Sequence, residues 1–251
     1  MALPVGVSVV SLNRAATLAQ TVERLRATLP GETPVVVVDN GSAGPDALTV
    51  LAVCEAYGWR VIRNAANAGL SRAVNQGLAA LDTDVLVHVD DDALVNSPED
   101  WAQQMAQRFE QCPELGLIVP NAHSEVIPHA LYDEVRWGLG MFWGLRRDAY
   151  DVVGGYDPQL LHQNECDLAL RVRMAGYTVG SVPSISVSHN DPGGARSGLS
   201  SAREHIGVVQ FRDKWAGYFR GRGWNYGTIP VYLMQHWPPD QEWYRRFALS
   251  N

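Results

Sequence analysis

Short apolar runs alternate with amphipathic segments through the first half of the chain, and this alternation constrains the fold more than any other feature. Valine-rich runs lie at Val7–Val10, Val35–Val38 and Val85–Val89, and shorter ones lie at Arg60–Ile62 and Leu117–Val119. Strands that are apolar on both faces are typical of a parallel sheet covered by helices on either side. We therefore expect an α/β chain with a Rossmann-like, mostly parallel sheet and helices on both faces.

Apolar residues at helical spacing fill the gaps between these runs, and each group ends at a residue that stops helices, such as Pro30 or Gly58. The predicted helices carry the stripe Leu18, Val22, Leu25 and Leu29, then the segment from about Asp46 to Tyr57, the stripe Leu70, Val74, Leu78 and Leu81, and the stripe Trp101, Met105, Phe109 and Cys112. The first half therefore has the order βαβαβαβαβ.

The second half of the chain is less regular. We expect turns over Ala149–Pro158, a helix over Asn164–Ala175, and strands over Thr178–Val182 and Ile185–Val187. The stretch from residue 189 to 198 is rich in glycine, so we expect it to be mobile.

The length of 251 residues suits one large domain. We expect it to span residues 1–200, in two parts over 1–120 and 121–200 that share one sheet. Residues 201–251 would form a tryptophan-rich extension on the same domain, and the last 37 residues, which hold four of the eight tryptophans, show little helical periodicity until their end. This extension could shape a ligand site, cover the sheet or form a homodimer interface, and the pattern leaves these alternatives open.

Composition excludes several classes of protein. The net charge of −7 and the absence of a basic stripe argue against nucleic acid as a partner. Three cysteines without metal-binding spacing argue against a disulfide framework or a zinc site. No apolar run approaches the roughly 18 residues of a transmembrane segment, and the N-terminal residues lack the features of a signal peptide. We expect a cytoplasmic protein, with contact to a membrane surface left open.

Three consecutive aspartates, Asp90, Asp91 and Asp92, directly follow the apolar run that ends at Val89. Adjacent carboxylates at a buried edge are costly without a counter-charge, which Mn²⁺ or Mg²⁺ would supply. If the extended backbone continued through the triplet, Asp90 and Asp92 would share a face and Asp91 would point away. The alternative is an acidic loop that leads into the next helix.

Other polar residues follow the remaining strands. Because the carboxyl ends of parallel strands meet at one edge, where open α/β sheets bind ligands, we expect these side chains to form a ligand site. Capping of helices and turns is the alternative explanation for such residues. The residues are Ser11 and Asn13 after the first strand, Asp39 and Asn40 after the second, and Arg63, Asn64 and Asn67 after the third.

Several segments together resemble the nucleotide-sugar-dependent glycosyltransferases of family 2, which have the GT-A fold. The segments are VSVVSLNR, VVVVDNGS, RNAANAGLSRAVNQGL, VHVDDDALV, LRRDAYDVVGGYD and QNECDLALRVRMAGYTVGSVP, and they cover roughly residues 5 to 190 in the family's order. VHVDDDALV resembles the DxD motif of the family. The asparagine-rich segment resembles rhamnosyltransferases and galactofuranosyltransferases.

The resemblance implies transfer of a sugar from a UDP-, dTDP- or GDP-sugar to a glycan or lipid-linked acceptor in glycan or polysaccharide synthesis, with UDP as the first choice. It assigns nucleotide binding to residues 1–120 and acceptor binding and catalysis to residues 121–200, and the ligand site that the extension could shape would then be the acceptor site. It also implies a role for individual residues. Asp39 would bind the base, Ser11 and Asn13 would frame the nucleoside, and Asn67, Gly69 and Arg72 would lie near the ribose or diphosphate. Asp90 would contact ribose and metal, Asp91 would lie beside the nucleotide-sugar, and Asp92 and His189 would bind the metal.

The catalytic base departs from the family pattern. The family has Glu-Asp where this chain has Asn164-Glu165, so Glu165 takes the position of the base and Asp167 is the alternative. Both acids also suit the first turn of a helix, where they interact favourably with its dipole. Trp143, in GLGMFWGLRR, either stacks on the acceptor sugar or belongs to the core.

Two other functions stay open on the sequence alone. A nucleotidyltransferase would use a similar core, but SLNRAATL lacks the glycine-rich, basic phosphate loop that we would expect after the first strand. A non-catalytic module that binds nucleotide-sugars is the second alternative, because the Asn164-Glu165 departure is compatible with a site that has lost its activity.

Overall fold

The computed structural model describes residues 3–97, 100–120, 126–135, 138, 140–190 and 198–221, and in residues 46, 198–205 and 219 it describes the backbone alone. The strands of the main sheet are β1 (Val5–Ser11), β2 (Val35–Asp39), β3 (Arg60–Arg63), β4 (Val85–Asp90), β6 (Leu115–Ile118), β7 (Ile127–Pro128), β8 (Asp133–Glu134), β9 (Phe142–Arg146) and β10 (Thr178–Ser181). The helices are α1 (Ala15–Thr28), α2 (Pro45–Ala56), α3 (Leu70–Ala79), α4 (Trp101–Gln111), α5 (Arg147–Val153), α6 (Asn164–Met174) and α7 (Gly198–Arg220).

In the described part of the chain, strands from both halves form one mixed sheet in the order β3-β2-β1-β4-β9-β6-β10-β8-β7. Strands β1 to β4 are parallel, as the valine-rich runs predicted. β9 then pairs antiparallel with both β4 and β6. The expected α/β class with a mostly parallel sheet is therefore confirmed.

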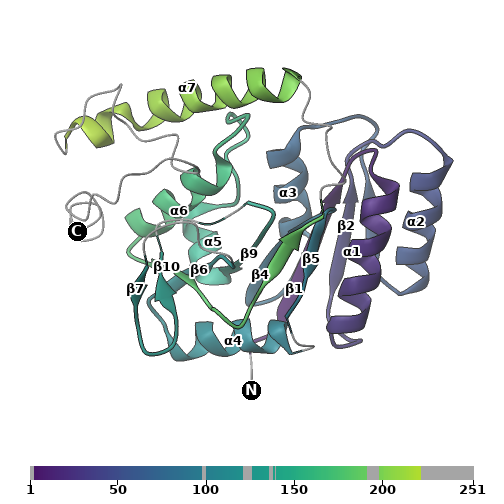
Figure 1. Cartoon of the computed structure of the whole chain (residues 1–251), viewed down its shortest axis with the longest axis horizontal. Coiled ribbons are helices and arrows are strands. Elements are labelled where there is room, and N and C mark those ends of the chain that lie inside the picture. Colours follow the sequence, from purple (N-terminus) through teal and green to yellow (C-terminus); the bar gives the residue numbers. More distant parts are fainter. Residues whose placement is uncertain are drawn as a thin grey trace.

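Alternate residues of the strands face two separate hydrophobic cores. Val7, Val37 and Val87 point toward the core that α1, α2 and α4 cover. Leu86 and Val38 point toward the core that α3, α5 and α6 cover. Since both faces of β1, β2 and β4 bury apolar side chains, their runs of β-branched residues need no polar alternation. Figure 1 shows the helices on either side of the sheet.

A short ribbon lies beside the main sheet and carries part of the site. β5 (Ala93–Val95) pairs antiparallel with β11 (Val187–His189), so that His189 lies opposite Ala93. The ribbon is held to α1, because Thr21 Oγ1 donates to the carbonyl oxygen of Asp91 over 2.9 Å. It brings His189, from the second half of the chain, next to the aspartate triplet.

Several elements differ from the sequence-based expectation, among them the short strands β5, β7 and β8, which were not predicted, and β11, which lies two residues later than the expected strand Ile185–Val187. The segment Ala149–Pro158 is not all turns, because α5 covers its first residues. β9 was not predicted, although it lies between β4 and β6. α7, of 23 residues, was not predicted, and its residues 215–220 lie in the segment that was expected to show little helix. The expected boundary at residue 200 stays a prediction, and residues 222–251, with most of the tryptophans of the extension, lie outside the described residues.

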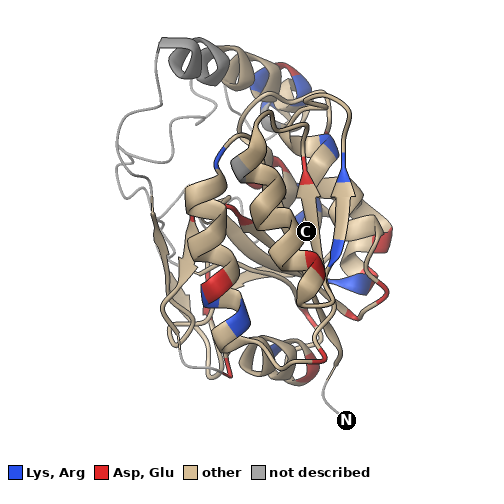
Figure 2. Cartoon of the chain, turned by 90° about the vertical axis from the view of Figure 1, so that its right-hand side faces the viewer, with Lys and Arg blue, Asp and Glu red and all other residues tan. Residues whose placement is uncertain are grey.

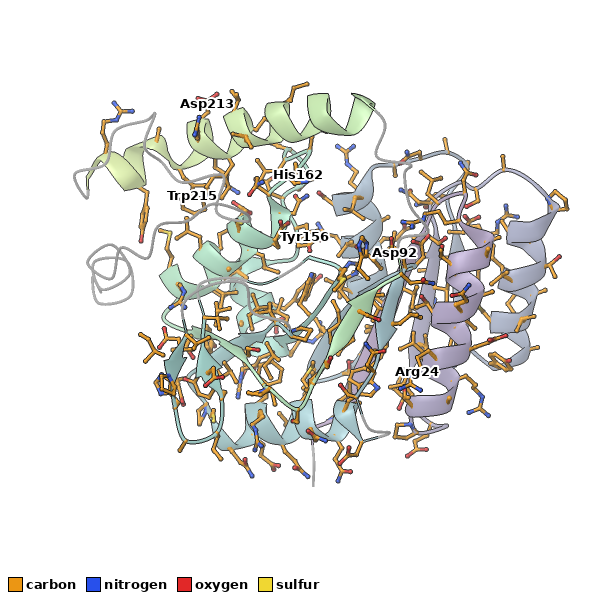
Figure 3. All side chains as sticks on the ribbon, viewed as in Figure 1. Arg24, Asp92, Tyr156, His162, Asp213 and Trp215 are labelled. Carbon is orange, nitrogen blue, oxygen red and sulfur yellow. The ribbon has the colours of Figure 1, made fainter. Side chains whose placement is uncertain are left out.

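α7 is attached to α6 through one buried carboxylate. Asp167 Oδ1 accepts from Trp215 Nε1 over 2.9 Å and lies 2.6 Å from Lys214 Nζ, while Asp167 Oδ2 accepts from Arg171 Nε over 2.8 Å. Lys214 Nζ also contacts Asp157 Oδ2 at 2.6 Å. Figure 3 shows Trp215 extending from α7 toward α6. Asp167 is therefore the anchor of α7.

Surface features of the described residues agree with the composition. Basic and acidic residues are interspersed on the side of the molecule shown in Figure 2. None of the helices in the described residues combines the length and apolarity needed to cross a bilayer.

The anchoring role of Asp167 predicts a loss of stability in Asp167→Asn. Removing one partner from a fully buried ion pair costs about 3–5 kcal/mol. Because Lys214 and Arg171 keep some contact with water, we expect the variant to lower the free energy of unfolding by about 2–3 kcal/mol. Urea denaturation followed by circular dichroism measures the change.

Asp157→Asn is the matched control, since it removes the other carboxylate that contacts Lys214. Its ion pair lies nearer the surface, so we expect it to cost less than about 1 kcal/mol. Equal stability of Asp167→Asn and the wild-type protein would contradict the anchoring role.

Candidate active site

The site lies where the parallel strands β1, β2 and β4 end. The register pairs Ser11 with Asp39 and Val10 with Asp90, so these strand ends lie side by side. Asp39 Oδ2 accepts from Arg63 Nε over 3.0 Å, and its Oδ1 accepts from the backbone N–H of Ser42. The carboxyl edge of the sheet thus gathers the polar residues that the strand-end pattern predicted.

Asp91 and Asp92 share one counter-charge. Arg14 Nη1 lies 2.5 Å from Asp92 Oδ2 and 3.5 Å from Asp91 Oδ1. Ser11 Oγ donates a hydrogen bond to Asp91 Oδ2 over 2.6 Å, and this bond fixes the orientation of the Asp91 carboxylate. Burial raises the pKa of Asp91 to about 7. The hydrogen bond from Ser11 and the charge of Arg14 act to lower this pKa, while repulsion from Asp90 and Asp92 raises it further.

Asp92 and His189 lie together as the ribbon of β5 and β11 dictates. His189 Nε2 is 3.1 Å from Asp92 Oδ2. Asp92 Oδ1 is buried and has no hydrogen-bond partner. An unpartnered carboxylate oxygen beside an imidazole nitrogen suits Mn²⁺, which accepts both ligand types. Within the described ranges, no group of three or more His, Cys, Asp and Glu side chains is arranged to hold a metal ion. Asp92 and His189 therefore fit two positions of a metal site.

Asp90 lies apart from this pair. Asp90 Oδ1 is 3.0 Å from His88 Nε2, and the Asp90 side chain is 30% exposed. The backbone turns at Asp91 and Asp92 instead of continuing as a strand. The extended backbone on which the shared face of Asp90 and Asp92 depended is therefore absent, and Asp91 and Asp92 both turn toward Arg14.

Glu165 lies at the start of α6, is half-buried, and lies close enough to Asp90 at the end of β4 for the two charges to interact. Burial raises the pKa of Glu165, and repulsion from Asp90 raises it further, while a backbone N–H and His162 oppose the rise. A β-carbon at Gly140 would lie 3.3 Å from Glu165 Oε2 and 3.3 Å from the Tyr156 hydroxyl. The absence of a side chain at Gly140 therefore leaves room beside the carboxylate.

Asp167, the alternative base, is fully buried and both its oxygens are bound to α7 or to Arg171. A base has to reach a hydroxyl of the acceptor. The geometry thus favours Glu165 over Asp167.

The predicted asparagines link neighbouring loops. Asn13 Oδ1 accepts from the backbone N–H of Ala43, and Asn67 Oδ1 accepts from Asn40 Nδ2 over 3.0 Å and from the backbone N–H of Gly69. Gly69 itself precedes α3 with a φ of 89°, which favours glycine. These contacts support the capping interpretation of the asparagines.

Two further predicted residues have contrasting positions. Arg72 is exposed on α3, and its side chain makes no hydrogen bond or ion pair with another residue of the described part. Trp143 is 1% exposed in β9, and its Nε1 donates to the Tyr156 hydroxyl over 2.7 Å. A buried ring cannot stack on an acceptor sugar, so Trp143 is a core residue as the alternative held.

Sequence reasoning assigned no role to Arg14, His88 or Tyr156. His88 is the residue with a recognisable signal, because it interrupts an otherwise apolar run at a position that faces the interior. Arg14 and Tyr156 follow no pattern that separates them from other loop residues. Residues 191–197, which belong to the glycine-rich stretch expected to be mobile, lie outside the described residues.

Comparison of the sequence with known protein families finds a matching model. Residues 7–126, just under half of the chain, match the model of glycosyl transferase family 2. No curated protein matches the sequence significantly.

Solved structures share the fold at low sequence identity. The mannosyltransferase PcManGT from Pyrobaculum calidifontis, in complex with GDP-Man and Mn²⁺, has a TM-score of 0.68 and 17% identity over 88% of this chain and 65% of its own. GalNAc-T7 with UDP, GalNAc and Mn²⁺ has a TM-score of 0.68 and 17% identity over 92% of this chain and 53% of its own. Residues 1–349 of S. aureus TarS with UDP-GlcNAc have a TM-score of 0.63 and 14% identity over 82% of this chain and 66% of their own.

Because Arg14 is the cation that Asp91 and Asp92 share, we predict that the Arg14→Gln variant needs a bound metal ion to keep its stability. The substitution leaves Asp91 and Asp92 without their shared cation. Because the Arg14 side chain is 38% exposed, water screens part of the loss, and we expect the free energy of unfolding to fall by about 1–2 kcal/mol in a chelator. Mn²⁺ should raise the melting temperature of this variant more than that of the wild-type protein.

Arg26→Gln, on the exposed side of α1, is the control and should behave as the wild-type protein does. Arg14→Gln with unchanged stability in the chelator, or with no response to Mn²⁺, would contradict this account of the two aspartates.

Proposed function

We propose that this chain is a metal-dependent, inverting glycosyltransferase of family 2. It would move a sugar from a nucleotide-sugar to a hydroxyl of a glycan or lipid-linked acceptor. The observation that carries the proposal is the arrangement around the end of β4. On one side Asp92 has an unpartnered buried oxygen beside His189, and on the other side Glu165 faces the same edge of the sheet.

Asp92 and His189 would hold the metal. A bound Mn²⁺ would neutralise the charge that builds up on the leaving diphosphate. Mn²⁺ in the PcManGT and GalNAc-T7 structures supports this choice, and the oxygen ligand of Asp92 would also suit Mg²⁺.

Glu165 would act as the general base in a single displacement. Its carboxylate takes the proton of the acceptor hydroxyl as that oxygen bonds to the anomeric carbon. The bond between the anomeric carbon and the phosphate oxygen breaks, and the nucleoside diphosphate leaves. Since attack comes from the side opposite the leaving group, the configuration at the anomeric carbon inverts. The raised pKa of Glu165 suits a base, because a more basic carboxylate accepts a proton more readily.

Asp39 would bind the base of the nucleotide, and UDP is our first choice. Arg72, exposed at the start of α3, would meet the diphosphate. The nucleotides in the similar structures include both GDP-Man and UDP-GlcNAc, so a panel of UDP, dTDP and GDP tests this choice. The likeness of the asparagine-rich segment to rhamnosyltransferases and galactofuranosyltransferases supports a second panel of donor sugars.

The proposed base predicts the activity of Glu165→Gln. Loss of a general base slows a reaction by about 10²–10⁴-fold, and we expect kcat to fall in this range. In the wild-type protein, activity should fall as acid protonates Glu165, at a higher pH than for an ordinary glutamate because its pKa is raised. Glu165→Gln should lack this acidic limb in its residual rate. A donor-hydrolysis and transfer assay across pH measures both effects.

Stability separates catalysis from folding in this test. The pKa of Glu165 is raised in the folded state, so the carboxylate destabilises the fold as pH rises through that pKa. Glu165→Gln should therefore be at least as stable as the wild-type protein at pH 8. Full activity in Glu165→Gln would contradict the base assignment. A wild-type protein that binds nucleotide-sugars without any turnover would instead favour a binding module.

A further inference from the structure

His88 is a fully buried imidazole in the middle of an apolar strand. Its neighbours in β4, Val87 and Val89, face the core under α1 and α4, while His88 and Leu86 face the opposite side. A buried polar ring is costly unless its nitrogens are hydrogen-bonded. Its presence at this position therefore needs a physical reason.

The contacts of His88 identify its partner. His88 Nε2 lies 3.0 Å from Asp90 Oδ1, and because an ionised carboxylate only accepts, Nε2 carries the proton. His88 Nδ1 is buried and has no hydrogen-bond partner. The polar contact of the ring is thus directed at one oxygen of Asp90.

Aromatic neighbours hold the ring in this orientation. The His88 ring lies 5.2 Å from the Trp143 ring and 6.0 Å from the Tyr156 ring, measured between centroids. Trp143 Nε1 donates to the Tyr156 hydroxyl, so the two rings hold each other in place. Asn75 in turn bonds the backbone of Tyr156 through both its amide nitrogen and its oxygen. The imidazole is therefore enclosed in a rigid setting.

We propose that His88 is a positioning residue that holds Asp90 away from the metal ligands and toward Glu165, where Asp90 binds a hydroxyl of the nucleotide-sugar. The inference rests on the proposed glycosyltransferase function. Asp92, by contrast, is held by Arg14 and His189. Repulsion from Asp90 contributes to the raised pKa of Glu165, which indicates that the two carboxylates lie near each other.

The partly exposed carboxylate of Asp90 is suited to a hydroxyl ligand. An ionised carboxylate forms a strong hydrogen bond with a hydroxyl, and the bond strengthens when a second donor fixes the carboxylate in place. The ribose and the transferred sugar both offer such hydroxyls. Asp90 would then contribute to the selection of the donor. Asp92 and His189 would bind the metal, and Asp90 would take no part in metal binding.

The test compares His88→Leu with His88→Gln, whose side-chain amide can reach the position of Nε2. Calorimetry with Mn²⁺ uses whichever of UDP, dTDP and GDP binds the wild-type protein best, and its hexose conjugate (UDP-glucose, dTDP-glucose or GDP-mannose). We expect His88→Leu to raise the Kd and the KM of the donor about tenfold, with a smaller effect on kcat. His88→Gln should recover most of this loss, and the Kd of Mn²⁺ alone should be unchanged in both.

The pattern of losses identifies the hydroxyl. Equal weakening with the nucleotide and its conjugate places the hydroxyl on the ribose, and weakening with the conjugate alone places it on the transferred sugar. Equal donor binding by His88→Leu and His88→Gln, whether weakened or not, would overturn the proposal.

Asp90→Asn gives an independent result if His88→Leu does not fold. It should weaken donor binding and leave the Kd of Mn²⁺ unchanged, whereas Asp92→Asn should lose Mn²⁺ binding. Loss of Mn²⁺ binding in Asp90→Asn would overturn the inference about Asp90 alone. A wild-type protein that binds none of the nucleotides would overturn the proposed function as well, so the two failures are distinguishable.

Discussion

The site depends on how the protein accommodates three adjacent carboxylates at the end of β4. Like charges at a partly buried edge repel one another, and each one needs a partner that offsets the loss of water. The chain meets this requirement by ending the strand within the triplet. Asp90 stays in line with β4 and contacts His88, while Asp91 and Asp92 turn toward Ser11, Arg14 and His189. One acidic sequence thereby supplies two different environments.

The rest of the fold maintains this division. The ribbon of β5 and β11 places His189 opposite Ala93. Thr21 of α1 donates a hydrogen bond to the backbone carbonyl of Asp91 and so holds the turn after β4. On the other side, β9 contributes Trp143, which packs against His88. α6 brings Glu165 to the same edge, and its neighbour Asp167 is used to anchor α7 instead of serving the ligand. Residues far apart in sequence are therefore needed at each carboxylate.

Hydrophobic periodicity and strand-end residues in the sequence predicted the central strands and the polar edge of the sheet. The valine-rich runs identified β1, β2 and β4, and the strand ends located the polar edge. β9 was missed because its glycines and tryptophan give no clear period, and α7 was missed because apolar residues do not form one stripe along it. The division of the triplet could not be predicted, since the turn at Asp91 is stabilised by contacts with α1 and Arg14. The burial of Trp143 likewise follows from the tertiary position of β9.

Anomalous diffraction from crystals soaked with Mn²⁺ and the preferred nucleotide-sugar tests the central claim most directly. The account predicts a manganese peak bound by Asp92 and His189 next to the diphosphate, with the base near Asp39 and with Asp90 and Glu165 facing the sugar side. Manganese bound by Asp90, or a nucleotide bound away from the ends of β1, β2 and β4, would contradict it.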